Sequence, residues 1–368
     1  MRVLLAGGGT GGHINPALAI ANEIKKNEPD SEILFAGTPK GMEAKLVPQA
    51  GYNFTTIKVA GFQRKLTPYN IYRNIKALWY LVFSGARAAR IIKSFKPDIV
   101  IGTGGYVSGP IVKKAQNLGI KTAIHEQNAF PGVTTKLLAP AADAVMLAFP
   151  KAKEFLPESC KFHITGNPIR ESILLARKDK SRKALGLDDR FCLLSFGGSL
   201  GAETINRVAS EVIALNIGEF NHIHATGKYG TELVPELLKK KGIENLPSGT
   251  IVREYIDNMD ECLAAADLVV CRAGAITLSE LAAAGKPAVL IPSPNVAENH
   301  QFKNAKAVEE NGAALVYEDK NIDYEAVAKD IVSLINDKNK VKTLEKNASA
   351  NAIVDANERI YKIIKGLF

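Results

Sequence analysis

The sequence predicts an α/β protein of two doubly wound domains, each built on a parallel sheet. Strand-like and helix-like segments alternate along the chain, and several strand-like segments are continuous runs of Val, Ile and Leu. Such runs are typical of parallel strands that are buried on both faces. The 368 residues also exceed what one hydrophobic core usually holds, so we expect two domains.

The expected elements follow one another in strand–helix order through both halves of the chain. In the first half, strands are expected at residues 2–6, 32–36, 99–102, 122–125 and 144–147. In the second half, they are expected at residues 191–196, 222–225, 250–253, 268–271, 288–291 and 314–316. The clearest helical patterns lie at residues 16–26, 205–216 and 277–284.

A short segment rich in turn residues, Thr165-Gly166-Asn167-Pro168, marks the expected linker between the domains. We assign residues 1–165 to the first domain and residues 166–347 to the second. Residues 348–364 have the pattern of one further helix, and we expect this C-terminal segment, about 348–368, to return to the first domain.

A glycine-rich turn follows the first strand of each domain: GGGTGGH at residues 7–13 and GGSLG at residues 197–201. Glycine lets the backbone approach a ligand closely, and the unpaired N–H groups at the start of the next helix favour a phosphate or diphosphate. Tight strand–helix packing is the alternative for either turn taken alone. Because the turn occurs twice, we expect two nucleotide-type domains that face one cleft.

A nicotinamide cofactor is disfavoured. Gly7, Gly9 and Gly12 have the spacing of a dinucleotide-binding turn, but such turns need an acidic residue at the end of the second strand. Gly37 and Thr38 occupy that point instead.

Composition excludes several other classes of protein. Apolar residues make up 46% and charged residues 23% of the chain, as in ordinary globular proteins. The four cysteines have no CxxC spacing, so we expect buried, reduced thiols and neither a disulfide framework nor a zinc site. There is no run of 18 or more apolar residues, so no membrane-spanning helix is expected.

The net charge of +9 is concentrated between Lys45 and Pro97, a stretch without Asp or Glu. Its ten basic residues are Lys45, Lys58, Arg64, Lys65, Arg73, Lys76, Arg87, Arg90, Lys93 and Lys96. The large apolar residues among these cations include Ile75, Leu78, Trp79, Leu81, Val82 and Phe83. This pattern favours an anionic membrane surface as the partner, with Arg73, Ile75, Lys76, Leu78, Trp79, Phe83, Arg87 and Arg90 as the contact residues.

Two other interpretations of this segment remain. It could be a core helix with a solvated charged face. Nucleic acid is the competing polyanion, but the chain has no helix-turn-helix or aromatic–basic sheet motif, so we expect no nucleic-acid partner.

Seven sequence blocks together resemble one family, the bacterial glycosyltransferases that add N-acetylglucosamine to undecaprenyl-diphospho-muramoyl-pentapeptide and so convert lipid I into lipid II. The blocks are GGTGGH (8–13), GGYVSGP (104–110), HEQN (125–128), TGNPIR (165–170), GGSLGA (197–202), RAGAITLSE (272–280) and HQ (300–301) with Asn304-Ala305. They occur in the family's order over nearly the full chain.

The resemblance implies a GT-B fold, in which two Rossmann-like domains face a central cleft, and an enzyme of peptidoglycan synthesis at the cytoplasmic face of the cell membrane. The C-terminal domain would bind UDP-N-acetylglucosamine (UDP-GlcNAc), and the N-terminal domain would bind the lipid acceptor. Some relatives have Gln-Gln where this chain has His300-Gln301, so the resemblance assigns no role to His300.

Each family position is carried over to the matching residue. Arg170 and Ile256 match positions near the uracil, Ser199 the donor phosphates, and Gln301 the sugar. The segment Ala275, Ile276, Thr277, Leu278, Ser279 and Glu280 matches the surroundings of the ribose and phosphates, with Glu280 on the ribose hydroxyls. Thr10, Gly11, Gly12 and Asn128 match N-domain positions that face the donor, and Tyr106 and Asn128 would line the acceptor side.

Several of these residues also have a purely structural interpretation. Thr277 and Glu280 have the spacing of a capping box, and Ser199 could be a helix N-cap. His125 could be a buried histidine that closes the sheet, and His13 could pack at a helix start against a strand. The functional alternative makes His13 the base that accepts a hydroxyl proton near neutral pH.

The expected reaction is an inverting transfer to the C4 hydroxyl of the acceptor by single displacement. We expect no cofactor and no metal ion, because the motifs contain no Asp-x-Asp pair and Asp188-Asp189 lies in a turn that we expect to be solvated. Helix N-termini and backbone N–H groups would then stabilise the leaving UDP. A UDP-GlcNAc epimerase or another UDP-sugar-binding protein of the same fold is the alternative.

Overall fold

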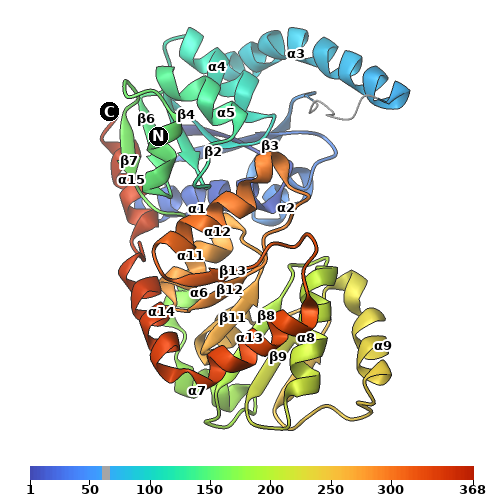
Figure 1. The fold of residues 1–368 in the computed structure, drawn as a ribbon. Coiled ribbons are helices and arrows are strands. Elements are labelled where there is room, and N and C mark those ends of the chain that lie inside the picture. Colours follow the sequence, from blue (N-terminus) through green and yellow to red (C-terminus); the bar gives the residue numbers. More distant parts are fainter. Residues whose placement is uncertain (60–66) are drawn as a thin grey trace. The chain divides into compact units, whose positions relative to one another are not determined.

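The structure is a computed structural model that describes residues 1–59 and 67–368. The chain forms two compact units, coloured along the sequence in Figure 1. Unit 1 comprises Met1–Pro168 together with Asp355–Phe368, and unit 2 comprises Ile169–Val354. None of the described helices has the length and apolar character needed to cross a bilayer.

Unit 1 contains a seven-stranded parallel sheet with the order β3-β2-β1-β4-β5-β6-β7. The strands are β1 (Arg2–Gly7), β2 (Glu32–Gly37), β3 (Asn53–Thr56), β4 (Ile99–Gly104), β5 (Lys121–Glu126), β6 (Ala144–Leu147) and β7 (Phe162–Ile164). The five predicted strands of this half are confirmed. The two strands at the edges of the sheet, β3 and β7, were not predicted.

Helices cover both faces of this sheet. They are α1 (Gly11–Asn27), α2 (Glu43–Gln49), α3 (Pro68–Phe95), α4 (Ser108–Asn117), α5 (Val133–Leu138) and α15 (Ala356–Lys365), with 3-10 turns η1 (Ala139–Ala141) and η2 (Pro150–Phe155). Alternate residues of β1 are buried in apolar clusters on opposite faces of the sheet. Val3 and Leu5 belong to the apolar cluster that contains residues of α1 and α15, while Leu4 and Ala6 belong to the cluster that contains residues of α3 and α4.

Unit 2 contains a six-stranded parallel sheet with the order β10-β9-β8-β11-β12-β13. The strands are β8 (Cys192–Phe196), β9 (Asn221–Ala225), β10 (Thr250–Arg253), β11 (Leu268–Cys271), β12 (Ala288–Leu290) and β13 (Ala314–Val316). All six predicted strands of this half are present. Leu193 and Val270 face a cluster with α8 and α13, and the alternate residues Leu194 and Val269 are equally buried.

The helices of unit 2 are α6 (Glu171–Leu175), α7 (Lys178–Ala184), α8 (Glu203–Leu215), α9 (Leu233–Lys240), α10 (Met259–Ala265), α11 (Ala275–Ala283), α12 (His300–Glu310), α13 (Tyr324–Asn336) and α14 (Lys338–Ala350), with 3-10 turns η3 (Lys228–Gly230) and η4 (Ala297–Asn299). The two sheets confirm the prediction of two doubly wound α/β folds. All four cysteines are free and buried, and burial raises the pKa of both Cys192 and Cys271 to about 12.

The strand order of each sheet reverses at one point, between β1 and β4 in unit 1 and between β8 and β11 in unit 2. Ligands of open α/β sheets bind beyond the carboxyl ends of the strands at such a switch point. The glycine turns at residues 7–10 and 197–201 leave β1 and β8 at these ends. Each glycine turn therefore lies where its own sheet is expected to bind a ligand.

The C-terminal segment differs from the single helix expected over residues 348–364. Helix α14 ends at Ala350, and α15 starts only at Ala356 and belongs to unit 1. Ile360 and Ile364 of α15 are buried in the same apolar cluster as Ile20 and Ile24 of α1. The break allows α14 to remain in unit 2 while α15 completes the core of unit 1.

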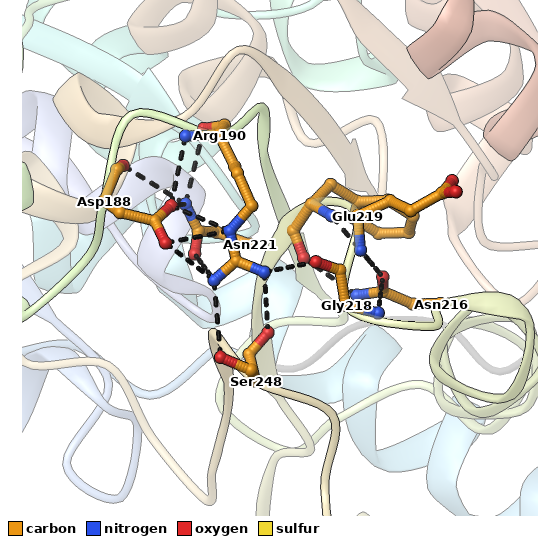
Figure 2. A network of polar contacts seen from close by, with 8 residues as sticks. Asp188, Arg190, Asn216, Gly218, Glu219, Asn221 and Ser248 are labelled. Carbon is orange, nitrogen blue, oxygen red and sulfur yellow. Dashed lines mark hydrogen bonds and ion pairs between the residues drawn. The ribbon is translucent and has the colours of Figure 1, made fainter.

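A polar network ties together three loops at the amino ends of the strands of unit 2 (Figure 2). Arg190 donates to Asp188 at 2.8 and 2.9 Å, to the carbonyls of Gly218 and Ser248, and to Asn221. The hydrogen bonds from Arg190 hold the pKa of Asp188 below its usual range. Asp188 and Asp189 are both exposed, as expected, and the carboxylate of Asp188 is also paired with Arg190. This network lies at the edge opposite the glycine turn and therefore supports the fold.

Candidate active site

The first glycine turn connects β1 to α1 and places Thr10 at the start of the helix. Thr10 has an extended backbone and is the N-cap of α1, and its carbonyl accepts from the N–H groups of His13 and Ile14 at 3.1 and 3.2 Å. Gly11 and Gly12 are the first two residues of the helix. Backbone N–H groups at these positions have no partner within a helix, so they can bind an anion.

His13 is half-buried, and its ring is oriented by the glycine turn. Its Nδ1 atom lies 3.0 Å from the carbonyl oxygen of Gly8 and 3.3 Å from Thr10 Oγ1. Because a carbonyl only accepts hydrogen bonds, Nδ1 carries the proton and Nε2 of the neutral ring has a lone pair. Within the described part of the chain, no hydrogen bond to Nε2 is present. This tautomer is the one that a base acting through Nε2 requires.

The loop after β4 packs directly on this histidine. A Cβ atom at Gly104 would lie 2.7 Å from Cδ2 of His13, and one at Gly105 would overlap the carbonyl oxygen of Gly8. Both glycines also have positive φ angles, 106° and 80°. The structure therefore brings the GGTGGH and GGYVSGP blocks together at the switch point of unit 1, and Tyr106 follows them as an exposed side chain.

A buried carboxylate that sequence reasoning missed holds the first glycine turn in place. Glu43, the first residue of α2, is fully buried and accepts from Gly9 N at 3.0 Å, Thr38 N at 2.9 Å and Thr38 Oγ1 at 2.7 Å. Burial alone would raise the pKa of Glu43, but the hydrogen bonds from Thr38 and Gly9 outweigh it and lower the pKa. No residue pattern in the sequence indicated this role, because one partner of Glu43 is the backbone N–H of Gly9.

Asn128 is fixed by a second buried carboxylate. Its N and Nδ2 atoms both donate to Glu126 Oε1 at 3.0 Å, and Glu126 also accepts from Gly132 N and Thr135 Oγ1. His125 is 1% exposed and donates from Nε2 to the carbonyl of Gly166. Desolvation lowers its pKa. These contacts favour the buried, structural interpretation of His125.

The second glycine turn has both structural and exposed glycines. A Cβ atom at Gly197 would overlap Ala202, and one at Gly201 would overlap the carbonyl of Thr226, so these two glycines are explained by packing. Gly198 has open space around it, and Ser199 is exposed. The N-cap of α8 is Ala202, so the interpretation of Ser199 as an N-cap is wrong.

Arg170 and Glu280 form an ion pair within unit 2. Arg170 Nε lies 2.8 Å from Glu280 Oε1, and the side chain of Glu280 is 10% exposed against 53% for Arg170. Helix α11 starts at Ala275 with Gly274 as its N-cap, so Thr277 lies inside the helix and the capping-box interpretation is wrong. The carboxylate of Glu280 is thus free of a capping role.

The other residues that were predicted to bind the donor lie on several elements of unit 2. Ile276, Thr277 and Ser279 are partly exposed on α11, whereas Ala275, Leu278 and Ile256 are buried. The side-chain oxygen of Gln301 accepts from Ser293 N at 2.9 Å. His300 opens α12 after two residues, Glu298 and Asn299, with left-handed φ angles of 54° and 53°.

Helix α3 exposes a row of aromatic side chains, Tyr69, Tyr72, Trp79 and Phe83, which we call the aromatic face of α3. At 3.6 residues per turn these four positions fall within about 80° of arc around the helix axis. Trp79 is 61% exposed and its ring centroid lies 4.7 Å from that of Phe83. Arg90 is exposed, while Arg87 donates to the carbonyl of Lys58. The side chains of Arg73, Ile75, Lys76 and Leu78 lie outside the described residues.

The described residues contain no group of three or more His, Cys, Asp or Glu side chains that could hold a metal ion.

Two family models match the chain. The glycosyltransferase family 28 N-terminal domain matches residues 3–147, and the family 28 C-terminal domain matches residues 192–360. The UDP-N-acetylglucosamine–N-acetylmuramyl-(pentapeptide) pyrophosphoryl-undecaprenol N-acetylglucosamine transferase of Acetivibrio thermocellus is 47% identical, over 100% of this chain and 98% of that protein. The protein of the same name from Ruminiclostridium cellulolyticum is 44% identical over 99% of both chains.

Solved structures agree with these matches. The crystal structure of Acinetobacter baumannii MurG superposes with a TM-score of 0.78 and 30% identity over 99% of both chains. The UDP-GlcNAc 2-epimerase of Neisseria meningitidis superposes with a TM-score of 0.66 over the full length of both chains, but at 14% identity. That second similarity shows a shared fold only.

Proposed function

The chain belongs to the family of UDP-N-acetylglucosamine–N-acetylmuramyl-(pentapeptide) pyrophosphoryl-undecaprenol N-acetylglucosamine transferases, and we propose that it catalyses this transfer. It moves N-acetylglucosamine from UDP-GlcNAc to the C4 hydroxyl of the muramoyl residue of lipid I, which gives lipid II for peptidoglycan synthesis. The observation that carries the proposal is the 47% identity over the full chain. The epimerase alternative has only a shared fold in its favour.

Unit 2 binds the donor in this proposal. The N–H groups of the exposed residues Gly198 and Ser199 and the N-terminus of α8 receive the diphosphate. The carboxylate of Glu280 accepts hydrogen bonds from the two ribose hydroxyls, a task for which its two oxygens are suited. Arg170 holds this carboxylate from the other side through the 2.8 Å ion pair and lies near the uracil together with Ile256. Gln301 contacts the sugar.

His13 of unit 1 is the proposed base. Its Nε2 atom takes the proton of the acceptor C4 hydroxyl while the hydroxyl oxygen attacks the anomeric carbon. The bond between the anomeric carbon and the diphosphate oxygen breaks, and its electron pair leaves with UDP. Attack from the face opposite UDP inverts the configuration, so the α-linked donor yields a β-1,4 product. In this proposal Thr10, Gly11, Gly12 and Asn128 are the donor-side residues of unit 1, and Tyr106 and Asn128 are its acceptor-side residues.

The aromatic face of α3 binds the cytoplasmic face of the cell membrane, which supplies the lipid-linked acceptor. Exposed Trp, Tyr and Phe side chains enter the boundary between headgroups and acyl chains, and neighbouring cations are attracted to anionic lipid. Arg90 and Lys93 are the described cations of α3 that are exposed. The protein is then peripheral and needs no spanning helix.

A transfer assay tests the proposal. The full-length protein is incubated with UDP-GlcNAc and a short-chain lipid I analogue, and UDP release and the disaccharide product are measured by chromatography and NMR. We expect one UDP per β-1,4-linked disaccharide. In the control without acceptor, we expect neither UDP release nor UDP-N-acetylmannosamine. Conversion of UDP-GlcNAc to its 2-epimer without acceptor would overturn the transferase in favour of the epimerase.

A further inference from the structure

One buried carboxylate of unit 1 has no part in the function proposed so far. Glu43 is 0% exposed, and its hydrogen-bond donors are Gly9 N, Thr38 N and Thr38 Oγ1. Within the described residues, no cationic side chain forms an ion pair with it. A buried carboxylate without a cation depends on its hydrogen bonds for stabilisation, so the groups that donate them show where its charge acts.

The hydrogen bond to Gly9 connects Glu43 to His13 through a single peptide group. Gly9 N–H and Gly8 C=O belong to the same peptide bond, and the described chain contains no cis peptide. In a trans peptide these two groups point in opposite directions. Glu43 Oε2 lies 3.0 Å from the N–H end of this peptide, and His13 Nδ1 lies 3.0 Å from its C=O end.

The order of the groups is therefore carboxylate, peptide N–H, peptide C=O and imidazole Nδ1–H. Hydrogen bonds in a chain polarise one another. A negative charge at the N–H end makes the carbonyl oxygen a stronger acceptor, so the carbonyl holds the Nδ1 proton more firmly. It also stabilises the positive charge that the ring acquires when Nε2 takes a proton.

We propose that Glu43 is a positioning residue for the base, acting on His13 through the Gly8–Gly9 peptide. The inference rests on the proposed role of His13 in proton transfer. Glu43 fixes the Nδ1–H tautomer, keeps Nε2 open for the acceptor hydroxyl, and supports the imidazolium that forms during attack.

We call Glu43, the Gly8–Gly9 peptide and the His13 ring the relay. The packing around the relay is consistent with this role. A Cβ atom at Gly8 would lie 2.6 Å from Glu43 Oε1, and Cβ atoms at Gly37 and Gly41 would overlap the Glu43 side chain. On the far side, Gly104 and Gly105 leave room for the His13 ring and for the Gly8 carbonyl. Five glycines thus allow the carboxylate, the peptide and the ring to approach one another.

A purely structural role for Glu43 is the alternative, since it also begins α2 and anchors the turn. In the positioning role the negative charge of Glu43 acts on the His13 ring, whereas in the structural role only its hydrogen bonds matter. The hydrogen-bonding partners of the His13 ring, Thr10 and the Gly8 carbonyl, carry no charge, and neither does Thr103, which donates to the His13 carbonyl. Neutralising Glu43 therefore removes the charge connected to the ring and leaves the partners of the ring itself, Thr10 and the Gly8 carbonyl, in place.

The test uses Glu43→Gln, because the glutamine oxygen can still accept from Gly9 N–H, although its NH2 group then replaces the oxygen that accepts from Thr38. The pH dependence of kcat is measured with UDP-GlcNAc and the lipid I analogue, and the His13 ring is followed by nitrogen-15 NMR, assigned with His13→Gln. We expect kcat to fall about tenfold and its acidic limb to move to lower pH by roughly one unit, because the imidazolium loses support. The Nδ1–H proton should also move upfield as its hydrogen bond weakens.

Glu126→Gln is the matched control for the NMR measurement. Glu126 is also a buried carboxylate of unit 1 that holds a loop, and no described contact joins it to His13. We expect the His13 signals of this variant to stay at their wild-type positions. Equal shifts in both variants would mean a general effect of unit 1 and would overturn the relay.

Three further outcomes decide the matter. A folded Glu43→Gln protein with an unchanged acidic limb and unchanged His13 signals would overturn the relay, whatever its activity. An Nε2–H tautomer in the wild-type protein would overturn it without any variant. Full turnover of His13→Gln would instead remove His13 from the proposed function, while the NMR measurement would still report whether Glu43 acts on the ring.

Discussion

At the scale of single residues, the ion pair between Arg170 and Glu280 defines the donor-side hypothesis. The carboxylate of Glu280 is nearly buried, is free of any capping role, and is held by Arg170 Nε at 2.8 Å. Because the carboxylate of Glu280 is already nearly buried, the binding of two ribose hydroxyls to it requires little further removal of water from its charge. Its contribution should therefore appear in affinity for the nucleotide and depend on the ribose hydroxyls.

We predict that Glu280→Ala weakens UDP binding by roughly 1–3 kcal/mol, because the ribose hydroxyls lose their acceptor. Isothermal titration of UDP against both proteins measures this difference. The control ligand is 2′,3′-dideoxy-UDP, which we expect to bind the variant and the wild type with the same affinity. Unchanged affinity of Glu280→Ala for UDP would contradict the ribose assignment.

Buried histidines of unit 2 lead to a prediction on pH. Ser195 Oγ lies 2.8 Å from both His222 Nε2 and His224 Nδ1. The other ring nitrogens, His222 Nδ1 and His224 Nε2, are buried without a hydrogen-bond partner in the described structure. Desolvation lowers the pKa of His224 to about 4 and the pKa of His222 well below its usual value. Both rings are therefore neutral in the fold.

In the unfolded chain the same histidines take up protons near pH 6.5. Between pH 6.5 and about 4 the unfolded state binds more protons, so stability falls as the pH falls, by about 1.4 kcal/mol per pH unit for each histidine. Urea unfolding at pH 7.5, 6.5 and 5.0 measures this loss. Replacing both rings, as in His222→Leu with His224→Leu, should flatten the slope in this window, and an equally steep slope would argue against the assignment.

Most of the site residues predicted from the sequence lie within continuous motifs. Arg170, Ser199, Glu280 and Gln301 were assigned because their blocks match the family in order, and these assignments stay predictions. Glu43 was missed because its role depends on a contact over 34 residues, with a peptide as the partner. A backbone N–H leaves no mark in the sequence, so no residue type could indicate this contact.

At the scale of elements, the buried strands of both units were predicted, and so were the edge strands β10 and β13 of unit 2, but the two edge strands of unit 1 were not. Four of the five predicted strands of unit 1 carry continuous apolar runs, because they are covered on both faces. Strand β3 has the sequence Asn-Phe-Thr-Thr and is only partly buried, and β7 has three partly buried residues. Each pairs with a single neighbour at the sheet edge, so neither needs the apolar pattern that marks a central strand.

Helix α3 is the element whose surface predicts a partner. Its aromatic face is exposed although aromatic side chains normally contribute to a core. The other side of the helix supplies Ala88 and Ile92 to the cluster shared with α4. One face of the helix thus packs in the core of unit 1, and the aromatic face is exposed and can bind another surface.

We predict that Trp79→Ser with Phe83→Ser releases the protein from vesicles of anionic lipid, including at high salt, because the apolar contribution is insensitive to screening. Arg90→Glu with Lys93→Glu should weaken binding mainly at low salt, as each cation near an anionic surface contributes about 1 kcal/mol. Vesicle flotation measures both. Lys26→Glu with Lys40→Glu is the control, because it changes the net charge by the same amount outside α3. If this control were released from the vesicles equally, the effect would come from net charge and not from α3.

At the scale of the whole molecule, the chain leaves unit 1 at Pro168 and returns to it at Asp355. Each unit has its own sheet and its own apolar clusters. The C-terminal helix is thus a part of unit 1 that follows unit 2 in the chain. Tyr361 and Lys365 also bind Glu28 of unit 1 at 3.0 and 2.7 Å, beyond the apolar contacts of the helix.

We predict that Ile360→Ala with Ile364→Ala destabilises unit 1 alone. Both side chains are at most 1% exposed, and each truncation of a buried Ile costs about 2–5 kcal/mol. Calorimetry should show a transition at lower temperature that UDP does not shift, and a second transition that UDP raises because it binds only folded unit 2. Transfer to the lipid I analogue should be lost at temperatures where UDP titration is still normal. The surface variant Glu358→Ala with Lys362→Ala serves as the control on the same helix, and we expect both transitions to stay near wild type. If the core variant instead lowered both transitions together and abolished UDP binding, unit 2 would depend on unit 1 for its fold, and the assignment of the donor site to an independent unit would be wrong.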